Sequence, residues 1–158
     1  MQVRRANVGD ADSISTLVSQ LSDQFICPSF SDAGRETLLG SMTPEKVAQY
    51  LTDDFEFHLA EDNGELVGVV GMRGKAHLYY LFVREDHQQH GLARQLWEMM
   101  RDARLAQGVR EFTVNASSNA VPVYERFGFC CTGERMEHGG AIAIPMRWCH
   151  PDDLDGRR

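Results

Sequence analysis

The 158-residue sequence predicts an α/β chain with a mixed sheet in a single domain. Apolar residues recur with helical spacing in some segments and form extended runs in others, and the two patterns interleave along the chain. The length suits one domain with its own core. We expect residues 1–150 to form that domain and residues 151–158, which are rich in charge, to be a frayed tail.

Two helices are predicted after a short strand at Val3–Arg5. Asp10 can cap the first helix, whose apolar stripe contains Ile14, Leu17, Val18, Leu21 and Phe25. The second helix begins at Thr43, because Pro44 suits the first helical position. Between the two helices the segment Phe30–Gly40 is expected to begin as a loop, since several helix breakers fall in or near it: Pro28, Ser29, Ser31 and Gly34.

Three strands and a long helix are predicted in the middle of the chain. The runs Phe55–Ala60 and Leu66–Met72 flank Asp62-Asn63-Gly64, which is a strong hairpin signal. The aromatic and apolar run His77–Val83 is typical of a central strand. An amphipathic helix follows and ends at Gly108, because glycine is the usual residue after a helix.

The last third is predicted to contain a strand at Phe112–Val114, a short helix at Val121–Phe127 and two final strands at Phe129–Glu134 and Ala141–Cys149. Pro145 argues against a central place for the last strand along its whole length, because proline cannot donate to a ladder. The predicted order is therefore strand, two helices, three strands, helix, strand, helix, two strands.

The formal net charge of −7 disfavours nucleic-acid binding, which needs a basic face. An acidic protein more readily accepts a cationic or neutral partner. No apolar run approaches the roughly 20 residues that span a bilayer, and no signal peptide is evident, so we expect a cytoplasmic protein without membrane contact. Five acids could attract an amine or could simply form a solvated face: Asp23, Glu36, Asp53, Asp54 and Glu56.

The four cysteines predict neither a metal site nor a disulfide framework. Their spacing matches no common zinc site, and none forms a CxxC pair. We expect buried or half-buried thiols in a reducing compartment, with a redox or nucleophilic role as the alternative, at Cys27, Cys130, Cys131 and Cys149.

The segment Gln88–Arg94 joins a predicted strand directly to a helix. Small residues at Gly91 and Ala93 let the backbone approach a ligand. The first turn of a helix has N–H groups without internal partners, and the helix dipole adds to their attraction for an anion such as a diphosphate. The segment lacks the glycine and lysine spacing of a P-loop or a dinucleotide fingerprint. The alternative is an ordinary turn in which Gly91 only permits the bend.

Two motifs resemble those of the Gcn5-related N-acetyltransferase (GNAT) family. The stretch from His77 to Arg94 is similar to the family's motif A, with Gln88, Gly91 and Ala93 at the defining places of Gln/Arg-x-x-Gly-x-Gly/Ala. The stretch Ala120–Phe129 resembles the tyrosine helix that ends in Gly-Phe. The order of elements also matches, so the resemblance covers nearly the whole chain and implies a mostly antiparallel GNAT-like fold.

The resemblance implies that acetyl-coenzyme A is the co-substrate, without a metal. The backbone of one strand would bind the pantetheine arm in the manner of an added strand, through Leu81, Phe82 and Val83. The N–H groups of Gln89, His90, Gly91, Leu92, Ala93 and Arg94 would hold the pyrophosphate, with Gln88 in the same loop. Arg94 would add a charged contact or would be a solvated helix residue.

The resemblance also implies catalytic roles for two residues. Tyr124 lies where the family has a tyrosine near the sulfur, and its phenol would protonate the departing thiolate; the alternative is a core tyrosine. His77 lies where some relatives have a glutamate base, and strand alternation predicts that it shares a face with Tyr79, Leu81 and Val83. The alternative for His77 is a hydrogen-bonded core or cleft histidine. Glu61, Tyr79 and Tyr80 are weaker candidates for the base.

The sequence departs from the family at Ser117, where many members have asparagine seven residues before the tyrosine. Asn119 is nearby and could contact the cofactor or cap the short helix. The resemblance implies acetyl transfer to a primary amine in a ternary complex, with a strand N–H, at Leu81 or Phe82, as oxyanion donor. A non-catalytic acyl-CoA sensor and a purely structural protein are the alternatives. The sequence does not decide whether the acceptor is a small molecule or a protein amine. A homodimer is possible by analogy with the family.

Overall fold

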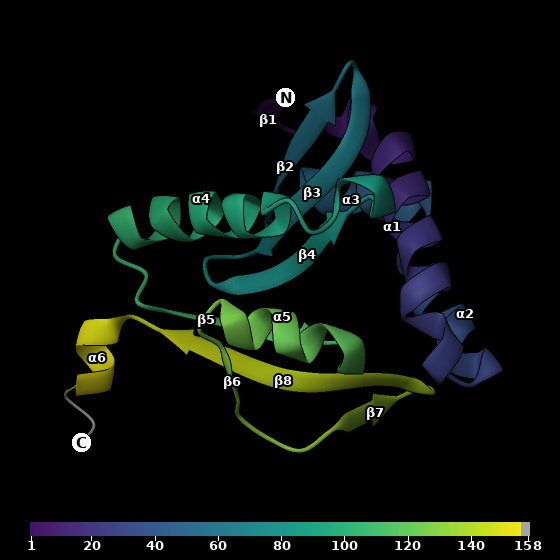
Figure 1. Ribbon diagram of the computed structural model, residues 1–158. Helices are drawn as coiled ribbons and strands as arrows, with labels where there is room; N and C mark the ends of the chain where they lie inside the picture. Colours follow the sequence, from purple (N-terminus) through teal and green to yellow (C-terminus); the bar gives the residue numbers. More distant parts are fainter. Residues whose placement is uncertain (156–158) are drawn as a thin grey trace.

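The computed structural model describes residues 1–155 as an open mixed sheet with helices on both faces (Figure 1). The strands are ordered β1-β2-β3-β4-β5-β8-β6, with β7 paired to β8. All neighbours are antiparallel except β4 and β5. The elements are β1 (Gln2–Arg5), α1 (Ala11–Phe25), α2 (Asp32–Gly40), α3 (Pro44–Thr52), β2 (Phe55–Asp62), β3 (Glu65–Arg73), β4 (His77–Val83), α4 (Leu92–Ala106), β5 (Glu111–Ala116), α5 (Val121–Arg126), β6 (Cys130–Cys131), β7 (Met136–His138), β8 (Ala141–Cys149) and α6 (Pro151–Asp155).

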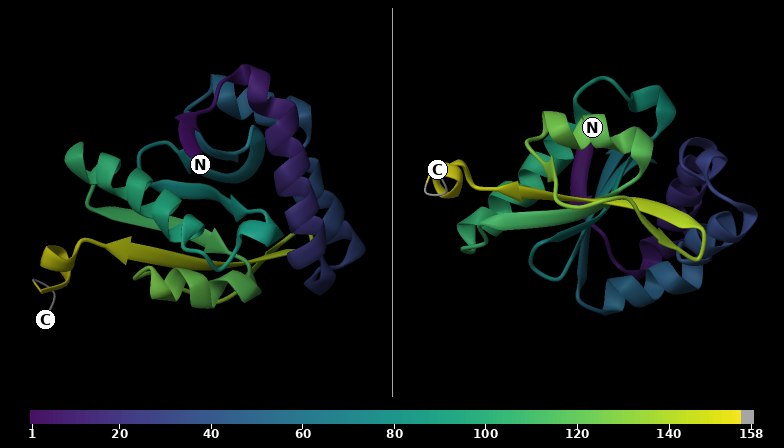
Figure 2. Two further views of the ribbon diagram at one scale, coloured as in Figure 1. Left: turned by 45° about the horizontal axis from the view of Figure 1, so that its top comes forward. Right: turned by 90° about the horizontal axis from the view of Figure 1, so that it is seen from below.

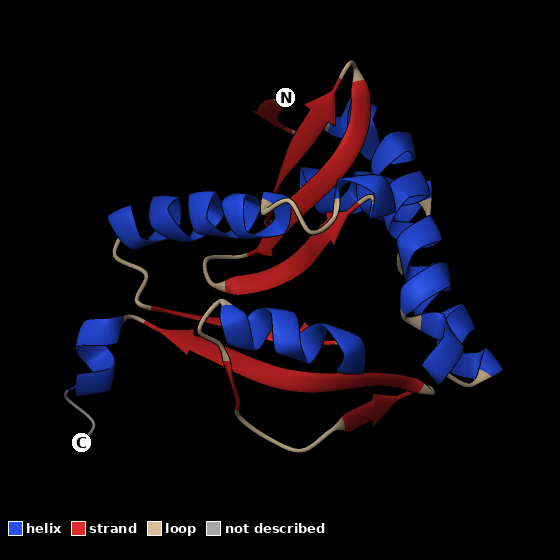
Figure 3. Ribbon diagram, in the orientation of Figure 1, coloured by secondary structure: helices blue, strands red, loops and turns tan. Residues whose placement is uncertain are grey.

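Each face of the sheet has its own apolar core. On one face α4 and α5 pack through residues such as Leu96, Trp97 and Tyr124. On the other face α1 and α3 pack through Ile14 and Val47 among others. Figures 2 and 3 show the N-terminal helices on the opposite side of the sheet from α4 and α5. No helix within residues 1–155 is long and apolar enough to cross a bilayer.

Most of the predicted elements are present, and local chemistry explains their ends. The Thr43 hydroxyl accepts a hydrogen bond from the Lys46 N–H, so Thr43 caps α3 as the sequence indicates. The β2–β3 hairpin turns at Asn63 and Gly64, which have φ angles of 53° and 80°. Both angles are positive, as a type I′ turn requires.

Three predictions for the N-terminal region are corrected. Residues 32–40 form a helix rather than the start of a loop, because the Ser31 hydroxyl accepts from the Gly34 N–H and caps it. Asp10 makes no side-chain cap of α1 and instead binds Arg4 and closes a capping box with Asn7. The two predicted helices of this region are therefore three.

The C-terminal strands also differ from the prediction. The single strand expected at Phe129–Glu134 is shorter, and the structure has two short strands, β6 and β7, on either side of a loop. β8 pairs with β5 from Ile144 to Cys149 and with β6 only at Met146 and Arg147, so β8 is not central along its whole length, as Pro145 predicts. The Pro145 carbonyl accepts from the Thr132 N–H. Cys130 and Cys131 are exposed rather than buried, whereas Cys27 and Cys149 are buried as expected.

The tail is helical at Pro151–Asp155, where the sequence predicted fraying, and Arg110 forms an ion pair with Asp153. Residues 156–158 of the predicted tail lie outside the described part of the chain. The domain boundary at residue 150 stays a prediction.

β4 carries a bulge that changes which residues share a face. Gly71 pairs with Tyr80 and Met72 pairs with Leu78, so Tyr79 is an extra residue. Tyr79 and Tyr80 therefore both pack toward α1 and α3, whereas Leu81 and Val83 pack toward α4. The predicted common face of His77, Tyr79, Leu81 and Val83 is wrong, because strict alternation ends at the bulge.

The parallel pair of β4 and β5 is short. His77 pairs with Thr113 and Leu78 with Val114, and the pairing then stops. Figure 1 shows the two strands diverging from this point. The divergence begins directly before the bulge at Tyr79, which fits the bending that an extra residue gives a strand. It opens a gap between the two halves of the sheet.

The two halves meet again where the turn between β7 and β8 packs on α2. A Cβ atom at Gly34 would collide with the carbonyl oxygen of Gly140, and one at Gly140 would collide with the Ser31 hydroxyl. Thr37 adds a hydrogen bond from its hydroxyl to the Gly139 carbonyl at 3.2 Å. This close backbone approach requires glycine at both positions.

We expect Gly34→Ala to lower the free energy of unfolding by about 1–3 kcal/mol, because the new methyl group must displace the Gly140 backbone. Gly40→Ala is the matched control in the same helix, since no atom lies within 4 Å of its added Cβ. It should be neutral or stabilise by up to about 1 kcal/mol. Urea denaturation of both variants measures the difference, and equal stabilities would contradict the contact.

Candidate cofactor and catalytic site

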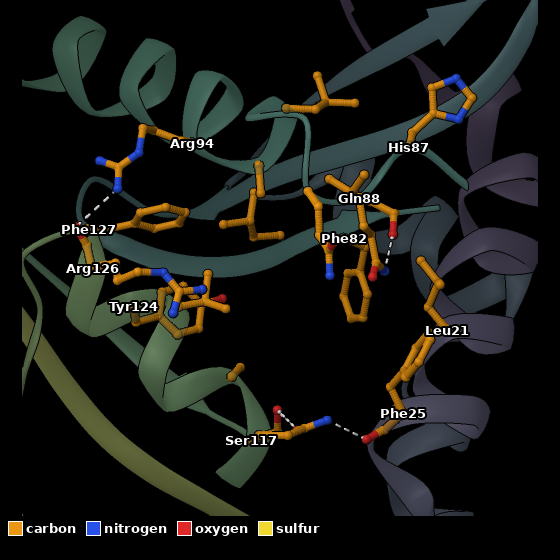
Figure 4. Close-up of a pocket in the computed structure, with 18 of the residues that line it drawn as sticks. Leu21, Phe25, Phe82, His87, Gln88, Arg94, Ser117, Tyr124, Arg126 and Phe127 are labelled. Carbon is orange, nitrogen blue, oxygen red and sulfur yellow. Dashed lines mark hydrogen bonds between the residues drawn. The ribbon is translucent and has the colours of Figure 1, made fainter. Parts of the chain in front are cut away.

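A cavity of about 550 Å³ lies where β4 and β5 diverge. The ends of four elements line it: β4, the start of α4, α5 with the loop before it, and the last turn of α1. Figure 4 shows Phe82 of β4 projecting between Tyr124 on one side and Leu21 and Phe25 on the other. The cavity therefore joins segments from the whole length of the chain.

Most of the residues singled out from the sequence line this cavity. They are Leu81, Phe82, Val83, Gln88, Gln89, Gly91, Leu92, Ala93, Arg94, Asn119 and Tyr124. His90 is exposed and is not among the lining residues, and neither is His77. The structure thus brings together two distant motifs and leaves two of the predicted side chains outside.

The loop before α4 has the geometry of an anion site. Gln89 and Gly91 have φ angles of 66° and 82°, and α4 begins directly after Gly91 without a side-chain cap. The N–H groups of the first turn are therefore available to a ligand. The Gln88 side-chain amide donates to the Val83 carbonyl at 2.9 Å, which ties the loop to the end of β4.

Arg94 lies on the first turn of α4 and reaches toward α5. Its guanidinium donates to the Arg126 carbonyl at 3.2 Å and lies 5.0 Å from the centre of the Phe127 ring. Arg94 and Arg126 are both exposed and both line the cavity. Two cationic side chains therefore flank the mouth of the cavity beside the free N–H groups of α4.

Tyr124 lines the cavity from α5 and has an exposed fraction of 8%. Burial raises the pKa of its phenol above the ordinary value of 10.0. The phenol therefore stays protonated at neutral pH. A protonated phenol beside a cavity can donate a proton to a leaving group.

His77 lies at the start of β4, where β4 and β5 are still paired. Its Nδ1 atom is hydrogen-bonded to the Thr113 hydroxyl at 2.8 Å. Burial, with Arg73 nearby, lowers the pKa of His77 to about 4, so the imidazole is neutral at physiological pH. The prediction that His77 is the base therefore rests on the resemblance alone, because the side chain does not line the cavity.

The weaker candidates for the base also lie outside the cavity lining. Glu61 accepts a hydrogen bond from Arg4, and the Tyr79 hydroxyl donates to that of Tyr50. The Tyr80 hydroxyl is buried without a partner, and burial raises the pKa of this phenol. Each of these groups is therefore held in a structural contact or in the core.

The last turn of α1 is a wall of the cavity that sequence reasoning missed. Leu21 belongs to the apolar core, as its helical spacing predicts, and it also lines the cavity. Phe25 is 37% exposed rather than a core residue and lines the cavity with Ile26. The Asn119 side chain donates to the Phe25 carbonyl at 2.6 Å, so Asn119 ties α1 to the loop before α5 rather than capping α5. Gln24 donates to Glu85 and ties α1 to the loop before α4.

His87 was also missed, and it lines the cavity beside Gln88. Its two ring nitrogens are hydrogen-bonded to Asp86 at 2.8 Å and to Asp62 at 2.9 Å. The hydrogen bonds to Asp62 and Asp86 raise the pKa of His87, and desolvation, with a smaller effect from Arg84, opposes them. The His87 side chain therefore braces the loop before α4 against the β2–β3 hairpin. The histidine-rich composition of this loop was the only signal in the sequence.

The site thus combines diverging parallel strands, a helix that begins after a glycine, and a tyrosine across the cavity. Residues 26–149 match the family model described as "Acetyltransferase (GNAT) domain". The chain belongs to the GNAT family and is an acetyltransferase by that membership. No curated protein sequence matches it.

Solved structures with low sequence identity share the fold. A Gcn5-related N-acetyltransferase from Rhodopseudomonas palustris has a TM-score of 0.82 at 20% identity, with 94% of each chain covered. The PaiA N-acetyltransferase from Thermoplasma acidophilum, in complex with coenzyme A, has a TM-score of 0.79 at 13% identity, with 95% of this chain and 100% of that chain covered. An aminoglycoside 6′-N-acetyltransferase complexed with coenzyme A has a TM-score of 0.67 at 15% identity, covering 94% of this chain and 97% of the other.

We expect His87 to stabilise the protein at low pH and less at high pH. Its pKa is raised in the folded state, so its contribution is complete below its ordinary value of 6.5 and is lost as the pH rises through the raised value. The difference in melting temperature between the wild type and His87→Gln should therefore shrink as the pH increases from about 6 to 9. A melting-temperature difference that stays constant across this range would contradict the stabilising contacts of His87 with Asp62 and Asp86.

Proposed function

We propose that the protein transfers the acetyl group of acetyl-CoA to a primary amine by direct attack in a ternary complex. The observation that carries this proposal is the cavity itself. The part of β4 that is no longer paired with β5, the start of α4 and Tyr124 all converge there. Two of the structures that share the fold were solved with coenzyme A, which supports the choice of cofactor.

The pantetheine arm would extend along β4 at Leu81, Phe82 and Val83, where pairing with β5 has ended. The pyrophosphate would bind the loop that contains Gln88, Gln89 and His90 and the N–H groups from Gly91 to Arg94. Arg94 and Arg126 would add charge-assisted contacts to phosphate. An N–H of Leu81 or Phe82 would polarise the thioester carbonyl.

Tyr124 would complete the reaction. The amine nitrogen would attack the carbonyl carbon and release one proton, the C–S bond would break, and the phenol of Tyr124 would donate its proton to the departing thiolate. The raised pKa of the phenol keeps that proton in place until the thiolate forms.

A thiol-release assay with acetyl-CoA and a panel of amines tests the proposal and distinguishes it from acyl-CoA sensing without turnover. A cytoplasmic location and a dimer stay predictions from the sequence and the family.

Gly91→Ala should weaken coenzyme A binding, and Gly108→Ala should not. Both glycines have positive φ, at 82° and 93°, and neither has an atom within 4 Å of an added Cβ, so both substitutions impose similar backbone strain of about 1–2 kcal/mol. Only Gly91 begins the anion site. Saturating coenzyme A should raise the melting temperature of the wild type and of Gly108→Ala, and raise that of Gly91→Ala less. An equal rise in all three proteins, or none, would refute the assigned site.

Tyr124→Phe should lower kcat roughly a hundredfold and leave the affinity for acetyl-CoA nearly unchanged, because it removes the acid and retains the ring. Tyr80→Phe is the matched control, since Tyr80 is also a buried tyrosine but does not line the cavity. Steady-state kinetics of both variants give the comparison. Equal losses of kcat and affinity in Tyr124→Phe, or full activity, would contradict the acid role.

A further inference from the structure

The end of the cavity opposite the start of α4 is apolar. Leu21 and Phe25 of α1 face Phe82 of β4 across it (Figure 4). Ile26 also lines the cavity, and Ser117 and Asn119 are polar members of the lining. If the cofactor occupies the α4 end as proposed, this apolar end is left for the acceptor. The inference below therefore rests on the proposed function.

The residues that line the cavity within the described chain include no aspartate or glutamate. The basic side chains among them are His87, Arg94 and Arg126. Several acids close to the lining are already hydrogen-bonded: Glu85 accepts from Gln24, and Asp62 and Asp86 bind His87. Glu125, between Tyr124 and Arg126, is exposed and is not a lining residue. The cavity thus offers no carboxylate to an ammonium group, although the protein as a whole has a net charge of −7.

The lack of a carboxylate in the cavity lining favours some amines over others. Burying an ammonium group without a partner costs several kcal/mol, so a polyamine or an aminoglycoside would lose affinity for each extra charge that it brings into the cavity. An apolar group gains about 25 cal/mol for every Å² that it buries against Leu21, Phe25 and Phe82. The lining therefore favours one amine with an apolar neighbour over several amines.

The same surroundings act on the reacting nitrogen. Desolvation in a cavity whose lining includes no carboxylate disfavours the ammonium form of the acceptor. The titratable lining residues are poorly suited to take its proton, because His87 is hydrogen-bonded to two carboxylates and burial raises the pKa of Tyr124. An amine that arrives already neutral needs no base in the cavity.

We infer that the acceptor is a monoamine with an apolar group close to its nitrogen, and that it is taken up as the free base. Its nitrogen forms the C–N bond, and the C–S bond breaks. One proton then leaves the nitrogen for water, while Tyr124 gives one to sulfur and regains one from water.

Thiol release with phenethylamine, spermidine, an aminoglycoside and a lysine-containing peptide tests the substrate class. We expect kcat/KM for phenethylamine to exceed that for each of the others by about tenfold or more, which corresponds to about 1.4 kcal/mol. Equal or greater activity with spermidine, the aminoglycoside or the peptide would overturn the inference and leave the proposed acetyl transfer intact. No thiol release with any amine would refute the proposed function itself.

Phe25→Glu tests the missing carboxylate directly. Phe25 is 37% exposed, so the substitution should leave the fold intact, which a thermal melt verifies. The ratio of kcat/KM for spermidine to that for phenethylamine should rise about tenfold, because the new carboxylate can pair with an ammonium. Val8→Glu is the control, as Val8 is exposed and lies outside the cavity lining. If the ratio of kcat/KM for spermidine to that for phenethylamine is similar in Phe25→Glu and Val8→Glu, the lack of a carboxylate in the lining does not select the amine.

The pH dependence tests uptake of the free base. With phenethylamine, kcat/KM should rise with pH and level off at the pKa of the amine, and with its β,β-difluoro analogue it should level off at lower pH. His77→Gln should preserve both curves. If kcat/KM has its inflection at the same pH for both amines, or if the inflection disappears in His77→Gln, a side chain of the enzyme is the base. Either result would overturn this part of the inference.

Discussion

The divergence of β4 from β5 is the constraint on which the rest of the site depends. Two residue pairs join the strands, and the backbone of β4 beyond Leu78 is then free of β5. An extra residue, Tyr79, follows at once, and a bulge bends its strand. Without this early end to the parallel pairing, the sheet would be continuous and the cavity between its halves would be closed by backbone hydrogen bonds.

The open sheet explains the ties found elsewhere between the two halves. Asn119 and Gln24 connect α1 to the loops on the two sides of the cavity. The Gly139–Gly140 turn packs on α2 so closely that side chains at Gly34 and Gly140 are excluded. These contacts hold the walls of the cavity at a fixed separation where the sheet itself cannot. The N-terminal helices therefore contribute to the site as well as covering a face of the sheet.

The charge of the whole protein and the charge of its cavity differ in sign. Net charge governs solubility and long-range attraction, whereas a ligand inside a cavity responds to the side chains that it touches. Here the acids lie on the outer surface and in ion pairs, while the lining has cationic groups beside the phosphate loop and apolar groups at the opposite end. The early expectation that acidic residues would attract the amine substrate concerns the approach to the protein and not the contents of the cavity.

The sequence by itself determined the features that depend on neighbours along the chain. These are the periodic helices and strands, the Asn63-Gly64 hairpin, the start of α4 at Gly91 and the motif that contains Tyr124. Only the tertiary structure decided the features that depend on distant residues. Residues 32–40 look like a loop because Gly34 weakens a helix, yet that glycine is required by the backbone of Gly140, more than 100 residues later. The helical spacing predicts that Phe25 is a core residue, but Phe25 lines the cavity. His77 does not line the cavity. The bulge, the short β4–β5 pairing and the Asn119 contact that set these positions arise only when the chain has folded. Local patterns encode periodicity and turn chemistry, whereas the lining of a cavity is set by which segments meet in space.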